Sequence, residues 1–301
     1  MRTADSRPRH AAPRAAGAIL VIALATAACG RFQGGTGPGT GGSPSPAPGS
    51  SDALVLRMDT SGGFVAPQTT LQSMPGFSLF ADGRVITQGA QMEIYPGPAL
   101  PSVVVTQITP EGDQALVQAA LDAGLGANHS YTTLTISDMP TTTFTLMTNG
   151  VTYTTSVYAL GAGGGTAPGM SSSERAARAA LEKFSAELTD LRGSLPQGSV
   201  GADKQYTPGG LRVFVQLPQP TPDPGLDQKA ATWPLSTPLA RFGKPAPGIP
   251  GTGTRCGTVT GSDLDRLLPL ARSANQLTPW RSEGATFSLV FRVLLPDEEG
   301  C

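Results

Sequence analysis

The sequence predicts an α+β fold, with helices packed on antiparallel sheets. Short apolar segments occur in pairs around an Asp-Gly and an Asn-Gly dipeptide, which is the pattern of antiparallel hairpins. Other segments carry apolar residues at helical spacing and begin next to a Ser or Thr that can cap a helix. Charged residues make up only 14% of the chain, and this low fraction favours strands and loops over long charged helices.

The first expected elements are strands. Apolar, β-branched runs with turn residues between them predict strands over 53–58, 77–80, 84–87 and 102–108. Gly62-Gly63 ends the first strand. Asp82-Gly83 joins the second and third strands as a tight hairpin, because this dipeptide accepts positive φ angles. The folded part therefore starts with antiparallel pairing.

A helix is expected directly after these strands. Thr109 is the expected N-cap, and Pro110 lies in the first turn, where its missing N–H is not needed. Glu111 carries a carboxylate near the positive end of the helix. The helical spacing stops at Gly124, a residue type that commonly ends helices.

A second hairpin and a second helix follow. The segments 142–147 and 151–160 flank Asn149-Gly150 and predict the hairpin. Apolar residues at helical spacing predict a helix over 171–191, with Ser173 as its cap. Together with the earlier elements, these form one α+β unit.

The last third of the chain repeats the order of strand, helix and strand. Its expected strands are 211–217, 256–260 and 286–295. Ser262 is the expected cap of a helix that extends to Ala274, and residues 193–210 are expected to be loop. The tetrapeptides Thr-Phe-Thr-Leu at 143–146 and Thr-Phe-Ser-Leu at 286–289 each follow a helix, and from this we hypothesise two related modules.

The first 28 residues have the order of an export signal. Four arginines and one aspartate precede the apolar run 15–28, which is about fourteen residues long and too short for a permanent membrane span. Small residues directly before Cys29 resemble the lipobox of bacterial lipoproteins, although Thr26 stands where leucine is usual. The resemblance implies that the Cys29 thiol is diacylglycerated and that the peptide is cut before it. An ordinary secretory signal that leaves Cys29 free is the alternative.

The segment after Cys29 predicts a disordered tether. It is rich in Gly, Pro and Ser and has too few apolar residues to fold. Two acyl chains hold a protein durably on a membrane, so we expect a lipid-anchored protein on the extracytoplasmic face of the cell membrane. The predicted organisation is a signal peptide (1–28), a tether (29–51), an α+β module (52–195) and a second α+β module closed by a disulfide (196–301).

Cys256 and Cys301 remain as an even pair once Cys29 is assigned to lipid. In an oxidising compartment such a pair is interpreted as one disulfide. It would close a loop with about 44 residues between the cysteines and contribute about 4 kcal/mol on the loop-entropy relation. The rival interpretation is a redox-active or nucleophilic thiol, but the chain has no Cys-x-x-Cys spacing.

Composition argues against several functional classes. Removal of residues 1–28 changes the formal charge from −1 to about −4, and no basic run interleaved with aromatic residues remains, so nucleic acid is not an expected partner. His10 leaves with the signal and His129 stands alone, which supports neither a multi-histidine metal site nor a Ser-His-Asp triad.

The positions of the acidic residues can be explained by helix starts and a solvated tail, without a bound metal ion. Glu111 with Asp113, and Asp263 with Asp265, occupy expected helix starts, where carboxylates interact favourably with the helix dipole. The acidic residues 297–299 are expected to form a solvated tail. We therefore predict no metal site, no cofactor and no catalytic residue.

The body of the chain contains, in order, FSLFADGRV, ITPEGDQALVQAALDAGL and SDMPTTTFTLMTNGVTYTTSVYAL. This order resembles an uncharacterised family of bacterial secreted and lipoprotein domains. Its members share an Asp-Gly hairpin, a helix opened by Thr/Ser-Pro-Glu, a Tyr after that helix and an Asp before a threonine-rich strand. Tyr131 and Asp138 are the matching positions. The resemblance covers about half of the chain and implies a helix against an antiparallel sheet, but no activity.

These observations lead to three functional hypotheses. The favoured one is a lipid-anchored, non-catalytic binding module with an envelope protein or a cell-wall component as partner. The alternative is a hydrolase-like enzyme of unrecognised class, and a third is an inhibitor-like decoy with aromatic residues on an exposed loop. A deep pocket with convergent polar groups near His129 or the Asp clusters would favour the enzyme, whereas a flat or shallow apolar patch would favour binding. Trp233 and Trp280 adjoin prolines and are interpreted as core or corner packing.

Overall fold

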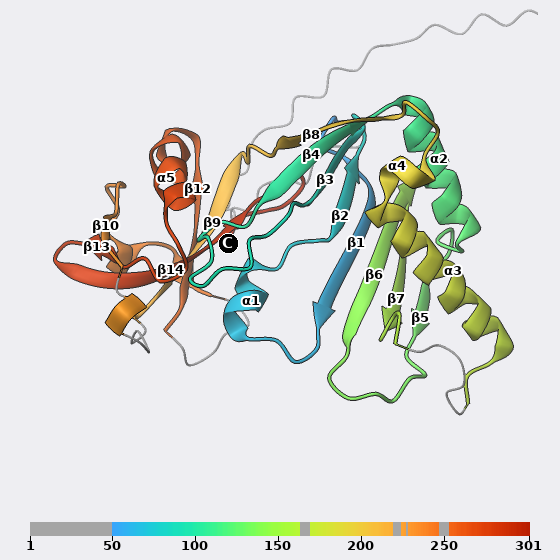
Figure 1. Cartoon of the computed structure of the whole chain (residues 1–301), viewed down its shortest axis with the longest axis horizontal. Helices are drawn as coiled ribbons and strands as arrows, with labels where there is room; N and C mark the ends of the chain where they lie inside the picture. Colours follow the sequence, from blue (N-terminus) through green and yellow to red (C-terminus); the bar gives the residue numbers. More distant parts are fainter. Residues whose placement is uncertain (1–49, 163–168, 219–223, 227, 247–252) are drawn as a thin grey trace, which may run out of the picture. The chain divides into compact units, whose positions relative to one another are not determined.

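The computed structural model describes residues 50–162, 169–218, 224–226, 228–246 and 253–301. These residues form two mixed β-sheets, of eight and six strands, with helices packed on them, so the predicted α+β fold is confirmed (Figure 1). The predicted signal peptide, the lipidation candidate Cys29 and the predicted tether as far as residue 49 lie outside the described residues.

The larger sheet is built from the first part of the described chain. Its strands are β1 (Leu54–Gly62), β2 (Phe77–Phe80), β3 (Arg84–Gln88), β4 (Val103–Ile108), β5 (His129–Tyr131), β6 (Pro140–Thr148), β7 (Val151–Tyr158) and β8 (Val200–Gln205). Their order across the sheet is β5-β7-β6-β1-β2-β3-β4-β8. Neighbouring strands are antiparallel, as expected, except for the parallel pair of β5 and β7 at one edge.

Both predicted hairpins are present in this sheet. The turn between β2 and β3 places Gly83 at a φ of 78°, and the turn between β6 and β7 places Asn149 and Gly150 at 51° and 73°. Glycine and asparagine adopt these left-handed angles more easily than other residues, so both dipeptides fit their turns. The second turn sets the register in which Phe144 lies opposite Thr155.

Two long helices cover one face of the larger sheet (Figure 1). The helices of this part are α2 (Pro110–Asp122), α3 (Ser172–Thr189) and the single turn α4 (Leu191–Ser194). Thr109 caps α2 as predicted, because its hydroxyl accepts a hydrogen bond from the Gly112 N–H at 3.3 Å. The predicted cap of α3 is wrong. Ser171 and not Ser173 caps this helix, by accepting a hydrogen bond from the Glu174 N–H at 3.1 Å.

The helix predicted over 171–191 is divided at Asp190. This residue has a ψ of 68°, outside the helical region, and its carboxylate accepts a hydrogen bond from the Gly193 N–H at 3.0 Å. Asp190 therefore ends α3 and caps α4, a role that aspartate performs well.

One hydrophobic core lies between the larger sheet and its two long helices. Alternate strand residues point towards the helices, as the period of two in a strand requires. The buried members include Leu56, Phe77, Leu79, Phe144, Leu146 and Val157 from the sheet and Leu116, Ala120, Leu181, Phe184 and Leu188 from the helices. The rings of Phe144 and Phe184 lie 6.0 Å apart across this layer.

The smaller sheet is built mainly from the last third of the chain. Its strands are β9 (Gly210–Gln216), β10 (Ala231–Thr232), β11 (Lys244–Pro245), β12 (Arg255–Thr260), β13 (Trp280–Ser282) and β14 (Ala285–Val293), in the order β10-β13-β14-β9-β12-β11. Its neighbours are antiparallel except β10 and β13. Single 3-10 turns occur at Pro224–Leu226 and Leu239–Arg241.

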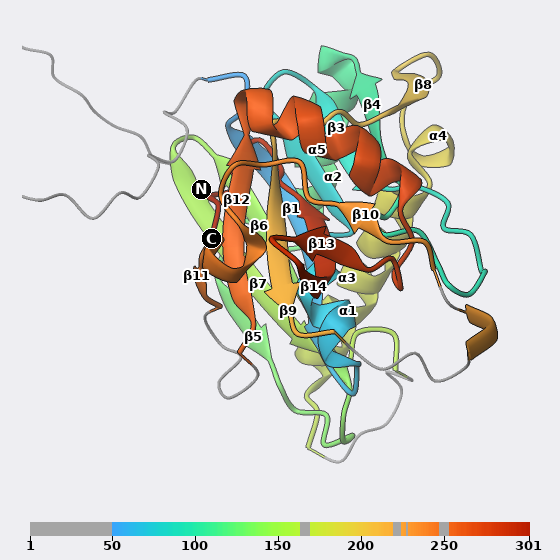
Figure 2. The same cartoon turned by 90° about the vertical axis from the view of Figure 1, so that its left-hand side faces the viewer.

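Two helices pack on opposite faces of the smaller sheet. Helix α5 (Gly261–Ser273) covers the face of Leu211 and Val213, whereas α1 (Pro67–Gln72) places Leu71 against Phe214 and Val290 on the other face. Figure 1 shows α1 between the two sheets, and Figure 2 shows α5 crossing in front of the strands. Helix α1 lies between two strands of the larger sheet in the chain and packs on the smaller sheet, so it connects the two sheets.

Several elements were not predicted: α1, β5, β8, β10, β11 and β13. Strand β8 lies within 193–210, which was expected to be loop, and all its residues after Val200 are exposed, so it has no apolar alternation. Its pairing with β4 holds it in the sheet. The predicted cap of α5 is also wrong. Thr260 occupies the N-cap position without a side-chain hydrogen bond, and Ser262 lies inside the helix.

A second hydrophobic core joins the two sheets. It contains Phe80, Ile86 and Val103 from the larger sheet, Leu211, Val213 and Phe291 from the smaller sheet, Leu267 and Ala271 from α5, and both tryptophans. Trp280 packs edge-on against Trp233 and Phe291, with ring centroids 6.3 and 5.5 Å apart. The interpretation of Trp233 and Trp280 as core residues is confirmed.

The sheet boundary and the predicted module boundary differ. The larger sheet continues beyond residue 195, because β8 pairs with β4. The repeated tetrapeptides lie on β6 and β14, which are neighbours of β1 and β9 respectively. Strand β6 thus lies beside the first strand of the larger sheet in chain order, and β14 lies beside the first strand of the smaller sheet. The hypothesis of related modules stays a prediction.

Candidate functional site

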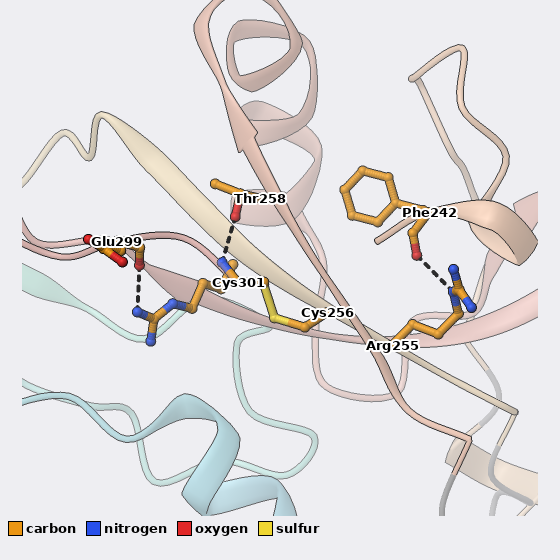
Figure 3. Close-up of a disulfide and its surroundings, with 7 residues drawn as sticks. Phe242, Arg255, Cys256, Thr258, Glu299 and Cys301 are labelled. Atoms are coloured by element: carbon orange, nitrogen blue, oxygen red, sulfur yellow. Dashed lines mark hydrogen bonds between the residues drawn. A yellow bond between two sulfur atoms is a disulfide. The ribbon is translucent and has the colours of Figure 1, made fainter. Parts of the chain in front are cut away.

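The predicted disulfide joins β12 to the segment after β14 (Figure 3). The Cα atoms of Cys256 and Cys301 are 5.7 Å apart, a common separation for disulfides. Cys256 is buried and Cys301 is exposed. The Cys301 N–H donates to the Thr258 hydroxyl at 2.8 Å, so the bridge and a hydrogen bond fix this segment on β12.

The acidic segment 297–299 is not a solvated tail, and this prediction is wrong. An Asp297 carboxylate oxygen accepts a hydrogen bond from the Arg57 guanidinium at 2.8 Å. Glu298 accepts two hydrogen bonds from Arg292, at 2.7 and 2.6 Å. The fold brings Asp297 to Arg57 on β1, and a turn after β14 brings Glu298 back to Arg292 on that strand. The segment therefore forms ion pairs with both sheets.

Burial and charge affect the ionisation of this cluster. Burial alone would raise the pKa of Glu298, but the hydrogen bonds and the positive charge of Arg292 outweigh it and hold the pKa below its ordinary value. Burial lowers the pKa of Arg212, the cross-strand neighbour of Arg292, and the charge of Arg292 lowers it further. Burial also raises the pKa of Tyr206, whose hydroxyl donates to the Leu294 carbonyl at 3.0 Å, to about 12.

His129, Tyr131 and Asp138 each have contacts or backbone angles that the fold explains. His129 is exposed on β5, with its ring stacked on Tyr131 at 5.7 Å. The Tyr131 carbonyl accepts a hydrogen bond from the buried Arg178 guanidinium at 3.0 Å, which attaches α3 to β5. Asp138 has a φ of 57°, a left-handed angle that aspartate tolerates better than most residues. The structure therefore does not bring His129 and Asp138 into one polar site.

The acidic pairs at the helix starts also remain apart from the disulfide region. Hydrogen bonds with its own backbone N–H and with Thr109 lower the pKa of Glu111, while burial raises the pKa of Asp113. Asp263 pairs with Arg266 on the surface of α5. Within the described ranges, no three His, Cys, Asp or Glu side chains are grouped closely enough to hold a metal ion.

A cavity of about 640 Å³ lies where β1 ends. Its lining includes Arg57, Asp59, Phe64, Asp138, Arg292 and Glu298. The two arginines are paired with Asp297 and Glu298. Asp59 and Asp138 have no hydrogen-bond or ion-pair partner among the described side chains, so the charge left uncompensated in this cavity is negative.

Exposed apolar side chains stand beside this cavity. Phe64 is 92% exposed and Val65 is 51% exposed on the loop between β1 and α1. Tyr95 lines a second cavity of about 240 Å³, together with residues of α1, and Ile94 is exposed beside it in the chain. Thr69 of α1 lines both cavities, so the two apolar loops flank one short helix. We call Phe64, Val65, Ile94 and Tyr95 the α1 surface.

Sequence reasoning assigned no role to the α1 surface. Phe64 and Val65 follow Gly62-Gly63 in a segment expected to be loop, and Tyr95 precedes a proline. An apolar residue in a glycine-rich or proline-rich loop can pack inwards or face water, and periodicity does not distinguish the two. The sequence signal for this surface was the presence of two aromatic residues, Phe64 and Tyr95, in segments expected to be loops or turns.

Comparison of the chain with family models, curated proteins and solved structures found no match. Among the described helices, none has both the length and the apolar character needed to cross a bilayer.

Proposed function

We propose that this chain is a lipid-anchored envelope protein whose folded part binds another protein through the α1 surface, without a catalytic role. The observation that carries the proposal is the exposure of Phe64 beside a cavity large enough for a partner side chain. A side chain as large as phenylalanine loses much apolar surface to water when a partner covers it, which provides binding energy.

Charge indicates the chemistry of the partner. Arg57 and Arg292 are already neutralised, whereas the Asp59 and Asp138 carboxylates face the same cavity without partners. A segment with an apolar anchor and a neighbouring Lys or Arg would complement this surface. We therefore propose a basic, apolar protein segment as the ligand, in preference to a cell-wall glycan.

The position of the α1 surface also favours a protein partner. The predicted tether leads into the start of β1, and Phe64 follows the opposite end of this nine-residue strand. At about 3.3 Å per residue these points are roughly 30 Å apart. The apolar loop is therefore distant from the point where the proposed anchor joins the folded part, and we propose a protein surface rather than lipid as its target.

The proposed anchor rests on the basic, apolar and small-residue order that precedes Cys29. The variant Cys29→Ala tests it in the producing cell. We expect this variant to move from the membrane fraction to the medium or to remain unprocessed, because it has no thiol to acylate. Unchanged processing and membrane retention would show that Cys29 is not the anchor.

Site-specific photo-crosslinking tests the binding role. A photoreactive phenylalanine analogue replaces Phe64 in one full-length variant and the exposed Leu217 in a matched control. After capture in the producing cell, the affinity of the identified partner is measured for the native chain and for Phe64→Ser, Leu217→Ser and Asp59→Asn/Asp138→Asn. We expect Phe64→Ser to weaken binding by roughly 30-fold, a loss of about 2 kcal/mol.

The proposal predicts capture from position 64 of a segment that contains basic and apolar residues. It also predicts weaker binding of that segment after the loss of Asp59 and Asp138, and unchanged binding in Leu217→Ser. Capture of lipid or glycan alone would contradict it. Equal loss of affinity in Phe64→Ser and Leu217→Ser would do so too.

A further inference from the structure

The segment Pro296–Cys301 crosses from one sheet to the other, and we call it the strap. Asp297 pairs with Arg57 on β1, and Glu298 pairs with Arg292 on β14. The backbone carbonyl of Glu299 accepts a hydrogen bond from Arg212, and the Cys256 bridge holds the last residue of the strap (Figure 3). These contacts are charge-assisted hydrogen bonds and the disulfide.

Three arginines, Arg57, Arg212 and Arg292, lie beneath the strap, and Asp59 and Asp138 line the same cavity as Arg57 and Arg292. Arg212 and Arg292 lie directly opposite each other on adjacent strands, an arrangement of like charges that destabilises a sheet unless an anion compensates it. Arg57 and Arg292 line the same cavity from the two sheets. The Nε atom of Arg212 is buried without a hydrogen-bond partner. The strap carboxylates are the anions that this cluster binds.

The geometry is that of an oxyanion site with an internal occupant. Arg292 donates two hydrogen bonds to one carboxylate, the bidentate arrangement that guanidinium groups make with carboxylates and phosphates. The side chains of Arg292 and Glu298 are only 8% and 13% exposed, so an outside anion has to displace Glu298 to reach Arg292. Arg57 and Arg292 form what we call the two-arginine site.

The disulfide is the bond of the strap that a reductant can break. The bridge fixes the end of the strap on β12, so it limits the movement of the strap away from the arginines. Cys301 is an exposed residue and Cys256 is a buried one, so attack by a thiolate is expected on the Cys301 side of the bridge. A dithiol reductant would attack Cys301 and release Cys256 as a thiolate that takes up a proton. The second thiol of the reductant would then displace Cys301, which leaves two cysteine thiols and a reductant disulfide.

We infer that the strap is a redox-controlled cover of the two-arginine site, and that opening of the Cys256–Cys301 bridge exposes this site to a carboxylate or phosphate ligand. The oxidised chain occupies the site with Asp297 and Glu298. The reduced chain exchanges these carboxylates for an external oxyanion. The two-arginine site lies in the cavity beside Phe64, but the inference rests on the strap contacts and does not require that the α1 surface binds a partner.

Amide hydrogen exchange and a phosphate titration of the full chain test this inference. The variants are Cys301→Ser, which opens the bridge without reductant, and Asp297→Asn/Glu298→Gln, which keeps the bridge and removes both carboxylates. Asp263→Asn, an exposed carboxylate that pairs with Arg266, is the matched control. The readouts are the exchange of amides in 294–301 and the change of Tm with inorganic phosphate at millimolar concentrations.

We expect Cys301→Ser and the dithiol-reduced chain to exchange the strap amides about tenfold faster or more, and their Tm to rise with phosphate. Asp297→Asn/Glu298→Gln should respond to phosphate with the bridge intact, whereas the oxidised native chain and Asp263→Asn should not. Addition of Arg292→Gln to Cys301→Ser should abolish the response.

Two results would overturn the inference. One is an equal phosphate response in the oxidised native chain and in Cys301→Ser. The other is no response in the folded Asp297→Asn/Glu298→Gln chain. If that chain does not fold, Glu298→Gln alone replaces it, because this variant removes the carboxylate that blocks Arg292 and keeps the pair of Asp297 with Arg57. A test of partner binding with Phe64→Ser remains separate, so failure of the proposed function and failure of this inference are distinguishable.

Discussion

Strands β6 and β7 of the larger sheet pair over eight residues around an Asn-Gly turn, whereas β10 and β11 at the edges of the smaller sheet are two residues each. The larger sheet packs two long helices on one face. The smaller sheet depends on an aromatic cluster, one disulfide and the strap. The comparison indicates that turns and alternating apolar residues specify the larger sheet, while contacts between distant residues hold the smaller sheet.

The largest expected effect is that of Trp280→Ala. Trp280 is almost fully buried and packs against Trp233 and Phe291, so its removal leaves a large cavity. We expect a loss of about 4 kcal/mol in the free energy of unfolding, measured by urea denaturation. Amide exchange should also accelerate in β10 and β13 more than in β6 and β7, because the smaller sheet has few other contacts at this edge.

Phe144→Ala is the control for this comparison. Phe144 is equally buried but belongs to the core of the larger sheet. It should cost a similar free energy and accelerate exchange in β6 and β7 instead. If both variants loosened the two sheets to the same extent, the distinction between the sheets would not hold.

The comparison explains which elements the sequence could predict. The Asp-Gly and Asn-Gly turns predicted both hairpins, because the required positive φ angles are a property of the dipeptides themselves. Thr109 likewise predicted the start of α2, since capping is local. Strands β10 and β11 have no sequence signal of their own, because two residues are too few to show the alternation of a strand. Their positions depend on pairing with β13 and β12 respectively.

Removal of the disulfide is expected to have the second-largest effect. The bridge spans a sequence separation of 45 residues, so Cys256→Ala/Cys301→Ala increases the entropy of the unfolded chain. We expect a loss of about 3 kcal/mol in the free energy of unfolding, measured by urea denaturation against the native oxidised chain. Faster exchange should be confined to the strap and β12. Protection should remain in β6 and β7, because their buried residues belong to the core under α2 and α3, and its loss there would contradict this expectation.

The candidate site was only partly predictable from the sequence, because contacts that depend on the fold leave no local sequence signal. The pairing of Cys256 with Cys301 followed from cysteine counting, which needs no geometry. The ion pair of Asp297 with Arg57 did not follow, because Arg57 lies 240 positions before its partner. Glu298 lies only six positions after Arg292, but no sequence pattern showed that the chain turns back after β14. An acidic run of this kind is usually solvated, and only the fold shows that arginines surround it.

Acid should destabilise the contact between the strap and β14. The pKa of Glu298 is lower in the folded chain than its ordinary value of 4.5, so the ionised carboxylate stabilises the fold above that pH. This stabilisation is lost as the pH falls through the folded pKa. Glu298→Gln should cost about 2 kcal/mol at pH 7 and give a smaller loss of stability below pH 4.5 than the native chain, measured by urea denaturation across pH 3 to 7. The exposed Glu283→Gln is the control and should leave the native pH dependence unchanged.

The smallest effect compares the starts of two helices, one on each sheet. The Thr109 hydroxyl caps α2 by accepting from the Gly112 N–H, whereas Thr260 occupies the same position before α5 without a side-chain hydrogen bond. We expect Thr109→Ala to lower the free energy of unfolding by about 1 kcal/mol and Thr260→Ala by no more than about 0.3 kcal/mol, in paired urea titrations. The difference follows because only the first substitution leaves a backbone N–H without its partner. Equal losses would mean that threonine contributes to these positions through its backbone preference rather than through capping, and α2 would then depend on distant contacts as much as α5 does.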